Sequence, residues 1–116
     1  MAAPVEVPST ADVRVTVTRT VQHRCPYVEE SDHGTVEISW TVAGGTVELH
    51  SLDAYLDGYA DSRISHEDLI DRIRHDLAVL TGITGVTVTG RYTTAGLHVE
   101  VTADAVLGNA VRASGA

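Results

Sequence analysis

The sequence predicts an α+β domain in which an antiparallel sheet carries two helices on one face. Two stretches with alternating apolar residues precede two amphipathic helical stretches, and two further alternating stretches follow them. Helices gathered between two strand pairs are typical of an antiparallel sheet covered on one face. A length of 116 residues allows a single domain.

Valine-rich alternation predicts the four strands, and the bias towards Val, Leu, Ile and Thr in a chain without Phe favours sheet. The apolar residues that define them, strand by strand, are Val13, Val15 and Val17; Val36, Ile38, Trp40 and Val42; Val86, Val88 and Tyr92; and Leu97, Val99 and Val101. Gly44-Gly45 is expected to form a turn after the second strand.

Two serines are predicted to cap the helices. Ser51 is expected to begin a short helix, and Ser65 a stronger one with Asp68 completing an approximate capping box. Gly82 sits where a C-terminal glycine belongs. The apolar residues of these helices are Leu52, Tyr55, Leu56 and Tyr59 in the first, and Leu69, Ile70, Ile73, Leu77 and Leu80 in the second.

The segments outside this pattern are small, polar or alanine-rich, without a clear period. We therefore expect a flexible N-terminal segment over residues 1–11, a single domain over residues 12–102 and a flexible C-terminal tail over residues 103–116.

Composition narrows the class of protein. Eight arginines, no lysine and 16 acidic residues give a net charge of -8, which disfavours nucleic acid as the default partner without excluding it as a substrate. The single cysteine excludes an intramolecular disulfide and fits a reducing compartment. Neither a signal peptide nor a bilayer-spanning run is apparent, so we expect a cytoplasmic protein with no membrane partner.

Cys25 lies between two predicted strands and is therefore expected on a loop. A lone cysteine is more often a small buried hydrophobe than a nucleophile, but neighbouring Arg24 and nearby His23 favour a thiolate. Asp32, seven residues on, can act as a general acid if desolvation raises its pKa. Its ordinary interpretation is a turn or strand-start aspartate.

His66, Glu67 and Asp68 open the second helix, where acidic residues are expected from the helix dipole alone. The functional alternative is that Glu67 points into a pocket and pairs with the ring N–H and amino donors of a guanine-like base. His23, Cys25 and His33 could in principle form a zinc site, but a single cysteine among scattered histidines is a weak signal, and no metal is predicted.

Taken together, these features resemble the QueF family. The resemblance covers residues 20 to 102 and rests on Cys25-Pro26, Asp32, His66-Glu67 and a stretch that contains Glu48, Ser51 and Tyr55. It implies the tunnelling fold (T-fold), a ββααββ unit that assembles into rings with active sites at subunit boundaries.

The resemblance also implies roles for individual residues. Cys25 would attack the nitrile of a 7-cyano-7-deazaguanine unit to form a thioimide, and Asp32 would protonate the nitrile nitrogen. His66 would position the intermediate and Glu67 would hold the deazaguanine ring, with Glu48 and Ser51 as further substrate-binding residues.

The sequence departs from the reductases of that family. Their Glu-x-Lys-Ser-x-Lys-x-Tyr stretch, which helps to hold NADPH, reads Glu48-Leu49-His50-Ser51-Leu52-Asp53-Ala54-Tyr55 here, so both lysines are missing. Their Arg-Gly-Gly segment reads Ala95-Gly96-Leu97. The chain is more similar to the QueF-like enzymes, which pass the thioimide to ammonia and give the amidine of archaeosine.

Four hypotheses follow, and the first is preferred: a QueF-like amidinotransferase without a cofactor, using ammonia and a base that is free, in a nucleoside or in nucleic acid. The second is an NADPH-dependent nitrile reductase. The third is a non-catalytic T-fold module that binds a purine- or pterin-like ring through Glu67. The fourth is a metal-dependent relative of the cyclohydrolases. The resemblance to T-fold proteins implies a homo-oligomer.

Overall fold

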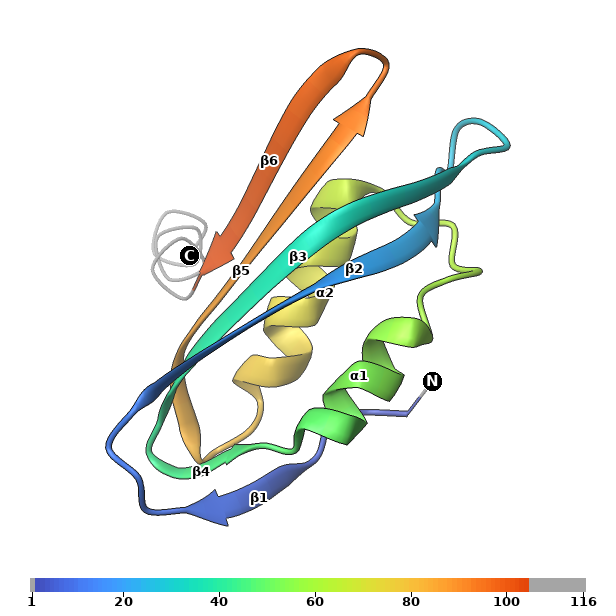
Figure 1. Ribbon diagram of the computed structural model, residues 1–116. Coiled ribbons are helices and arrows are strands. Elements are labelled where there is room, and N and C mark those ends of the chain that lie inside the picture. The colour runs from blue at the N-terminus through green and yellow to red at the C-terminus, as the bar shows by residue number, and fades with distance from the viewer. Residues whose placement is uncertain (1, 105–116) are drawn as a thin grey trace, which may run out of the picture.

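A computed structural model describes residues 2–104 of the chain. The elements in chain order are β1 (Glu6–Ser9), β2 (Arg14–Arg24), β3 (Ser31–Val42), β4 (Gly44–Val47), α1 (Leu49–Asp57), α2 (His66–Ala78), β5 (Ile83–Thr94) and β6 (Leu97–Asp104). Figure 1 shows the four long strands side by side with both helices packed on the sheet. The predicted α+β architecture, two helices on one face of an antiparallel sheet, is confirmed.

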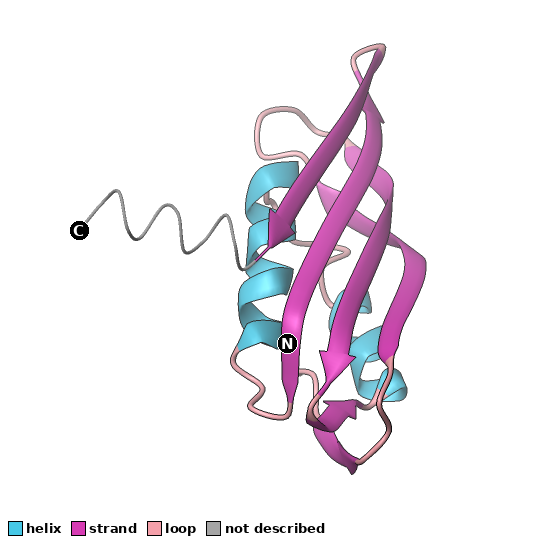
Figure 2. Cartoon of the chain, turned by 90° about the vertical axis from the view of Figure 1, so that its left-hand side faces the viewer, coloured by secondary structure: helices cyan, strands magenta, loops and turns pink. Residues whose placement is uncertain are grey.

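The four long strands form one antiparallel sheet in the order β2-β3-β5-β6, as Figure 2 shows from the side. Alternation along each strand separates a face that contacts the helices from a face exposed to solvent. On β3 the buried hydrophobic residues are Val36, Ile38, Trp40 and Val42, which are those that the sequence predicts. Val21 and Val88 continue this buried face on the neighbouring strands.

A second, two-stranded sheet pairs β1 with β4. The prediction of a flexible segment over residues 1–11 is therefore wrong for residues 6–9, whose short strand was hidden by Pro8 and by weak alternation. Gly44 and Gly45 belong to β4 instead of forming a simple turn, and Gly44 has a φ of 97°. At the other end, Ala103 and Asp104 complete β6. The rest of the predicted tail lies outside the described residues.

The helix caps differ partly from the prediction. Ser65 caps α2 and accepts a hydrogen bond from the Asp68 amide at 3.1 Å, as predicted. Glu48, not Ser51, caps α1, because its longer carboxylate reaches the amides of His50 and Ser51. The α2 helix ends at Ala78, before the predicted Gly82, whose amide instead donates to Glu6 in the second sheet.

The core lies between the sheet and the two helices. α2 contacts β5 and β6, and α1 contacts β2. The completely buried side chains of α2 are Leu69, Ile70, Ile73 and Leu77. No helix within residues 2–104 combines the length and the apolar character needed to cross a bilayer.

Candidate active site

The register of β2 against β3 places His23 directly opposite Asp32. Both positions continue the helix-facing side of the sheet, on which Val21 and Gly34 are also buried. His23 is completely inaccessible to solvent, and the Asp32 side chain is 14% exposed. Two polar residues at the end of an apolar face are therefore held together by strand pairing alone.

The segment between the helices, residues 58–65, brings His66 to the same place. The Arg24 amide donates to Ser62 O at 2.9 Å, and the Ile64 amide donates back to Arg24 O at 3.1 Å. His23 Nδ1 donates to Ile64 O at 2.8 Å. Because this segment is fixed to the end of β2, the first residue of α2, His66, begins beside His23.

Tyr92 on β5 completes an aromatic cluster with the two histidines. Its ring stacks on His66 with centroids 4.0 Å apart and an interplanar angle of 11°. Its edge contacts with His23 have a centroid distance of 5.4 Å. Gly34 makes room for the ring, since a Cβ there would lie 2.0 Å from a Tyr92 ring atom. We call His23, Asp32, His66 and Tyr92 the histidine cluster.

Several polar atoms of the histidine cluster are buried without a hydrogen-bond partner. They are His23 Nε2, His66 Nε2 and the Tyr92 hydroxyl. His66 Nε2 lies 3.2 Å from an Asp32 oxygen, but the two groups are not aligned as a hydrogen bond. Unpaired buried polar groups are costly, and they are characteristic of sites that meet a ligand.

Burial governs the electrostatics of the cluster. Burial lowers the pKa of His23 below 6.5, and its hydrogen bond to Ile64 O offsets only part of this effect. Burial, with a contribution from the Asp32 charge, raises the pKa of Tyr92 to about 12. The neutral forms of both side chains are therefore favoured at neutral pH.

Cys25 lies on the loop between β2 and β3, as predicted, and is partly exposed. Its amide donates to Glu30 O at 3.0 Å, which closes the loop directly after the His23–Asp32 pair. Arg63 binds both carboxylate oxygens of Glu29 at 2.6 and 2.8 Å. Glu29 raises the pKa of Arg63, with a smaller effect from Cys25, so a cation stands within electrostatic range of the thiol.

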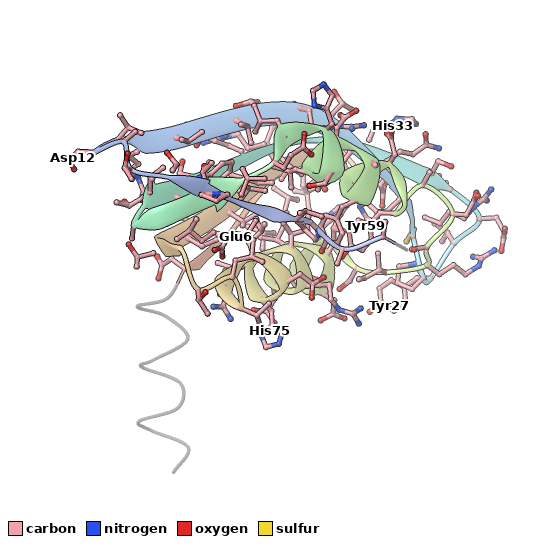
Figure 3. All side chains as sticks on the ribbon, turned by 90° about the horizontal axis from the view of Figure 1, so that it is seen from below. Glu6, Asp12, Tyr27, His33, Tyr59 and His75 are labelled. Carbon is pink, nitrogen blue, oxygen red and sulfur yellow. The ribbon has the colours of Figure 1, made fainter. Side chains whose placement is uncertain are left out.

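A hollow of about 700 Å³ lies next to this loop. Pro26 and Tyr27 form one wall, and residues 62–65 with one side of α2, from Asp68 to His75, form another. These wall residues adjoin Cys25 and His66 in sequence, although neither side chain lines the hollow itself. Glu67 is exposed on the same turn of α2. In Figure 3 Tyr27 marks this end of the molecule.

Glu48 and Ser51 lie elsewhere, at the start of α1 beside β4 and away from the β2–β3 loop (Figure 1). The Ser51 hydroxyl donates to Glu48 O at 2.7 Å and accepts from the Val5 amide at 2.9 Å. The hydrogen bond from the Ser51 amide, followed by that from His50, lowers the pKa of Glu48. Within one chain both residues hold the helix end and do not meet Cys25.

The structure thus brings together Asp32 and His66 beside the Cys25 loop and separates them from Glu48 and Ser51. It adds two residues to the predicted set, His23 and Tyr92. His23 falls two residues after Val21 on the apolar side of its strand, and this spacing is the signal in the sequence. His33 projects from the opposite face of the sheet to His23 (Figure 3). The two histidines therefore cannot join Cys25 in one zinc site.

A family profile described as QueF-like protein matches residues 31–107. The match includes Asp32, His66 and Glu67 and begins after Cys25. A crystal structure of the archaeosine synthase QueF-Like in the apo form has a TM-score of 0.78 and 21% identity, and the alignment covers 82% of this chain and 95% of that one.

Curated relatives are named NADPH-dependent 7-cyano-7-deazaguanine reductase. Those from Frankia casuarinae and Anaeromyxobacter dehalogenans are 33% and 32% identical over 73 and 80 residues, which cover 63% and 68% of this chain and 58% and 66% of the relatives. That from Acaryochloris marina is 29% identical over 69 residues, or 60% of this chain and 48% of the relative. The chain thus spans between 48% and 66% of these relatives' length. With the T-fold topology, the profile match shows that the chain belongs to the QueF-like protein family.

Proposed function

We propose that this chain is an enzyme that converts the nitrile of a 7-cyano-7-deazaguanine unit to an amidine, with Cys25 as nucleophile and ammonia as the second substrate. The observation that carries the proposal is positional. Cys25 leaves β2 two residues after His23, whose cross-strand partner is Asp32, and His66 stands 3.2 Å from that carboxylate. Membership of the QueF-like family supports the choice of a deazaguanine nitrile.

In the first step the Cys25 thiolate attacks the nitrile carbon. One π bond of the C≡N group breaks, and the nitrogen takes the proton of Asp32 in its acid form, giving a thioimide. A nitrile is a weak electrophile, so the reaction needs both a thiolate and a proton delivered as charge develops on nitrogen. The mostly buried setting of Asp32 limits competition from water for its proton.

Glu67 is proposed to hold the base. It lies exposed on the first turn of α2, between His66 and Asp68, and Asp68 lines the hollow next to the Cys25 loop. A carboxylate can accept hydrogen bonds from the ring N–H and amino group of a guanine-like edge, and a base without those donors would leave it unpaired. This contact would provide selectivity for the deazaguanine ring.

In the second step ammonia attacks the thioimide carbon, the C–S bond breaks, and the Cys25 thiolate is released with the amidine. The proton that the ammonia nitrogen loses returns to the Asp32 carboxylate and restores its acid form. Nitrile plus ammonia equals amidine, so this reaction needs no oxidant or reductant. His66, stacked on Tyr92 and adjacent to Asp32, is placed to orient the intermediate and to pass protons between the two nitrogens.

The nitrile reductase remains the second candidate, because the curated relatives at 29–33% identity carry that name. The residues present do not fit NADPH in the stretch that holds it in the reductases. His50 and Asp53 replace its two lysines. Asp53 pairs with Arg19, whose other nitrogen binds Asp57 at 2.6 Å, so this cation is already neutralised by two carboxylates.

Product analysis distinguishes the two reactions. We expect the protein, given 7-cyano-7-deazaguanine as base, nucleoside or RNA-borne nucleotide and ¹⁵N-ammonia, to form a labelled amidine that Cys25→Ala does not form. Consumption of NADPH with formation of an aminomethyl product would establish the reductase instead. Binding of the base without either product, unchanged in Cys25→Ala, would establish a non-catalytic binding module.

Assembly into a ring is part of the same proposal. Within residues 2–104, β2 and β6 are the edges of the four-stranded sheet, and edge strands can pair with neighbouring copies; on β2 the terminal Arg24 is already paired with residues 62 and 64. Glu48 and Ser51, which lie away from Cys25 in one chain, would then approach the Cys25 loop of a neighbour. Light scattering of the purified protein tests this, and a monomer would contradict it.

A further inference from the structure

His23, Asp32 and His66 have the composition and spacing of a metal site. One ligand atom from each lies within 4.8 Å of the other two. Two imidazoles with one carboxylate form a donor set used by zinc and by other first-row transition metals. This set shares only His23 with the zinc combination of His23, Cys25 and His33 in the sequence.

The Asp32–His66 contact fits two ligands of one cation better than a pair bonded to each other. Two ligands on a tetrahedral zinc, each at about 2.1 Å, lie about 3.4 Å apart. The observed separation is 3.2 Å, yet His66 Nε2 makes no hydrogen bond to the carboxylate because the groups are not aligned. Such a geometry is expected when the histidine nitrogen and the carboxylate oxygen both point towards one metal ion instead of towards each other.

His23 has the orientation that a ligand requires. Its Nδ1 donates to Ile64 O at 2.8 Å, which leaves the lone pair on Nε2. That atom is buried without a partner in a side chain that is completely inaccessible. Metal-bound histidines commonly use one ring nitrogen for the metal and give the other N–H to a backbone carbonyl in this way.

His66 is held equally firmly from the other side. Its ring stacks on Tyr92 at 4.0 Å and meets His23 edge-on at 5.1 Å. An ordinary His66–Asp32 ion pair would account for one contact but would leave His23 Nε2 unpaired in the core. A cation bound to all three residues accounts for both buried ring nitrogens.

We propose that His23, Asp32 and His66 bind one divalent transition-metal ion of the zinc class. Metal binding and the nitrile reaction then exclude each other, a consequence that rests on the proposed function. The metal takes the Asp32 oxygen whose proton the nitrile nitrogen needs. The bound form is therefore a resting form that chelators activate.

The binding test uses Co²⁺ as a spectroscopic probe, followed by displacement with Zn²⁺, on the whole chain after chelator treatment. We expect one equivalent of cobalt with d–d absorption of a four- or five-coordinate site. Loss of one ligand in His23→Gln or in Asp32→Asn should weaken binding by about 10- to 100-fold or more. Circular dichroism and urea unfolding show whether each variant is folded. If one of the two variants does not fold, the other still tests the site.

Matched controls separate this site from adventitious binding. His75→Gln removes an exposed histidine of α2 that points away from the sheet (Figure 3); it lines the hollow but is not part of the histidine cluster, and its loss should leave cobalt affinity unchanged. Cys25→Ala should also bind normally, without change in the cobalt spectrum. Absence of stoichiometric binding, or equal affinity in His23→Gln, Asp32→Asn and His75→Gln, would overturn the proposal.

A second measurement tests whether metal binding prevents the reaction with the nitrile. The rate of covalent attachment of the nitrile is measured with added Zn²⁺ and with a chelator. Metal binding with an unchanged attachment rate would refute the exclusion, and no attachment under chelation would refute the proposed function while leaving the metal site standing on the cobalt data.

Discussion

Two buried aromatic clusters lie in the helix-facing layer, and they differ in how their polar atoms are satisfied. In the first, Tyr55 donates to Asp76 at 2.6 Å and its hydroxyl lies 2.6 Å from that of Tyr59. The rings of these two tyrosines meet edge-on at 5.4 Å. We call Tyr55, Tyr59 and Asp76 the tyrosine cluster. In the histidine cluster, by contrast, two ring nitrogens and one hydroxyl have no partner.

The contrast separates a cluster whose hydrogen bonds stabilise the fold from one that, in the function we propose, takes part in the chemistry. A buried hydroxyl that donates to a carboxylate contributes to stability, whereas a buried polar atom without a partner costs free energy. Such a cost persists where a ligand or a reacting group supplies the missing partner. The tyrosine cluster therefore joins α1 to α2, and the histidine cluster faces the Cys25 loop.

The largest expected effect is on the rate of covalent attachment of the nitrile, when the one aspartate of each cluster is replaced by asparagine. Asp32→Asn removes the proton donor and should slow covalent attachment of the nitrile by about 10²- to 10⁴-fold. Asp76→Asn keeps an oxygen that can accept from Tyr55 and should leave that rate unchanged. Rates of mass gain measured side by side test this, and equal slowing in both variants would erase the distinction between the clusters.

Gly34→Ala should affect both stability and chemistry. The added Cβ would lie 2.0 Å from the Tyr92 ring, so the ring must move and release His66. Overpacking of this kind costs about 1–3 kcal/mol, measurable by urea unfolding. The double variant Gly34→Ala/Tyr92→Leu should recover part of that loss, because the smaller side chain removes the clash. No recovery would mean that Tyr92 is not the obstacle.

Removing one hydroxyl from each cluster sharpens the comparison further. Tyr55→Phe leaves Tyr59 and Asp76 without their shared partner and should lower the free energy of unfolding by about 1–3 kcal/mol. Tyr92→Phe removes a hydroxyl that bonds to nothing, so its free energy of unfolding should be unchanged or slightly higher. If Tyr92→Phe proves the more destabilising variant, the assignment of the two clusters is reversed.

The smallest effect concerns alkaline pH. The folded pKa of Tyr92, about 12, lies above the ordinary value of 10.0, so the folded state binds the proton more tightly. The resulting stability is present below pH 10 and is lost as pH rises towards 12. Unfolding midpoints of the wild-type protein should fall more steeply than those of Tyr92→Phe across this range. Parallel curves would contradict the buried, neutral state of Tyr92.

Local patterns in the sequence predicted most of the fold. Alternation around Ile38 and Val88 gave the correct strands and faces, because a half-buried strand shows its period directly. Ser65 was correctly predicted as a cap because its partner Asp68 lies three residues away. Pairing of β1 with β4 escaped prediction because it joins segments about forty residues apart in a register that no local pattern specifies.

The same limit applies to the site. Asp32 and His66 were predicted from their resemblance to a family, and the structure places them 3.2 Å apart. His23 was grouped with Cys25 and His33 by closeness in sequence, whereas strand register sets it opposite Asp32. A cluster assembled from four separate elements depends on register and on the path of residues 58–65, and neither is encoded in spacing along the chain.

The most direct test of the central claim is the intact mass of the protein after incubation with 7-cyano-7-deazaguanine in the presence of a chelator, beside Cys25→Ala. We predict a mass increase equal to one nitrile molecule, lost when the protein is denatured and treated with excess thiol, and no increase in the variant. An unchanged mass with the base, its nucleoside and nitrile-bearing RNA, or an equal increase in Cys25→Ala, would contradict Cys25 as the nucleophile.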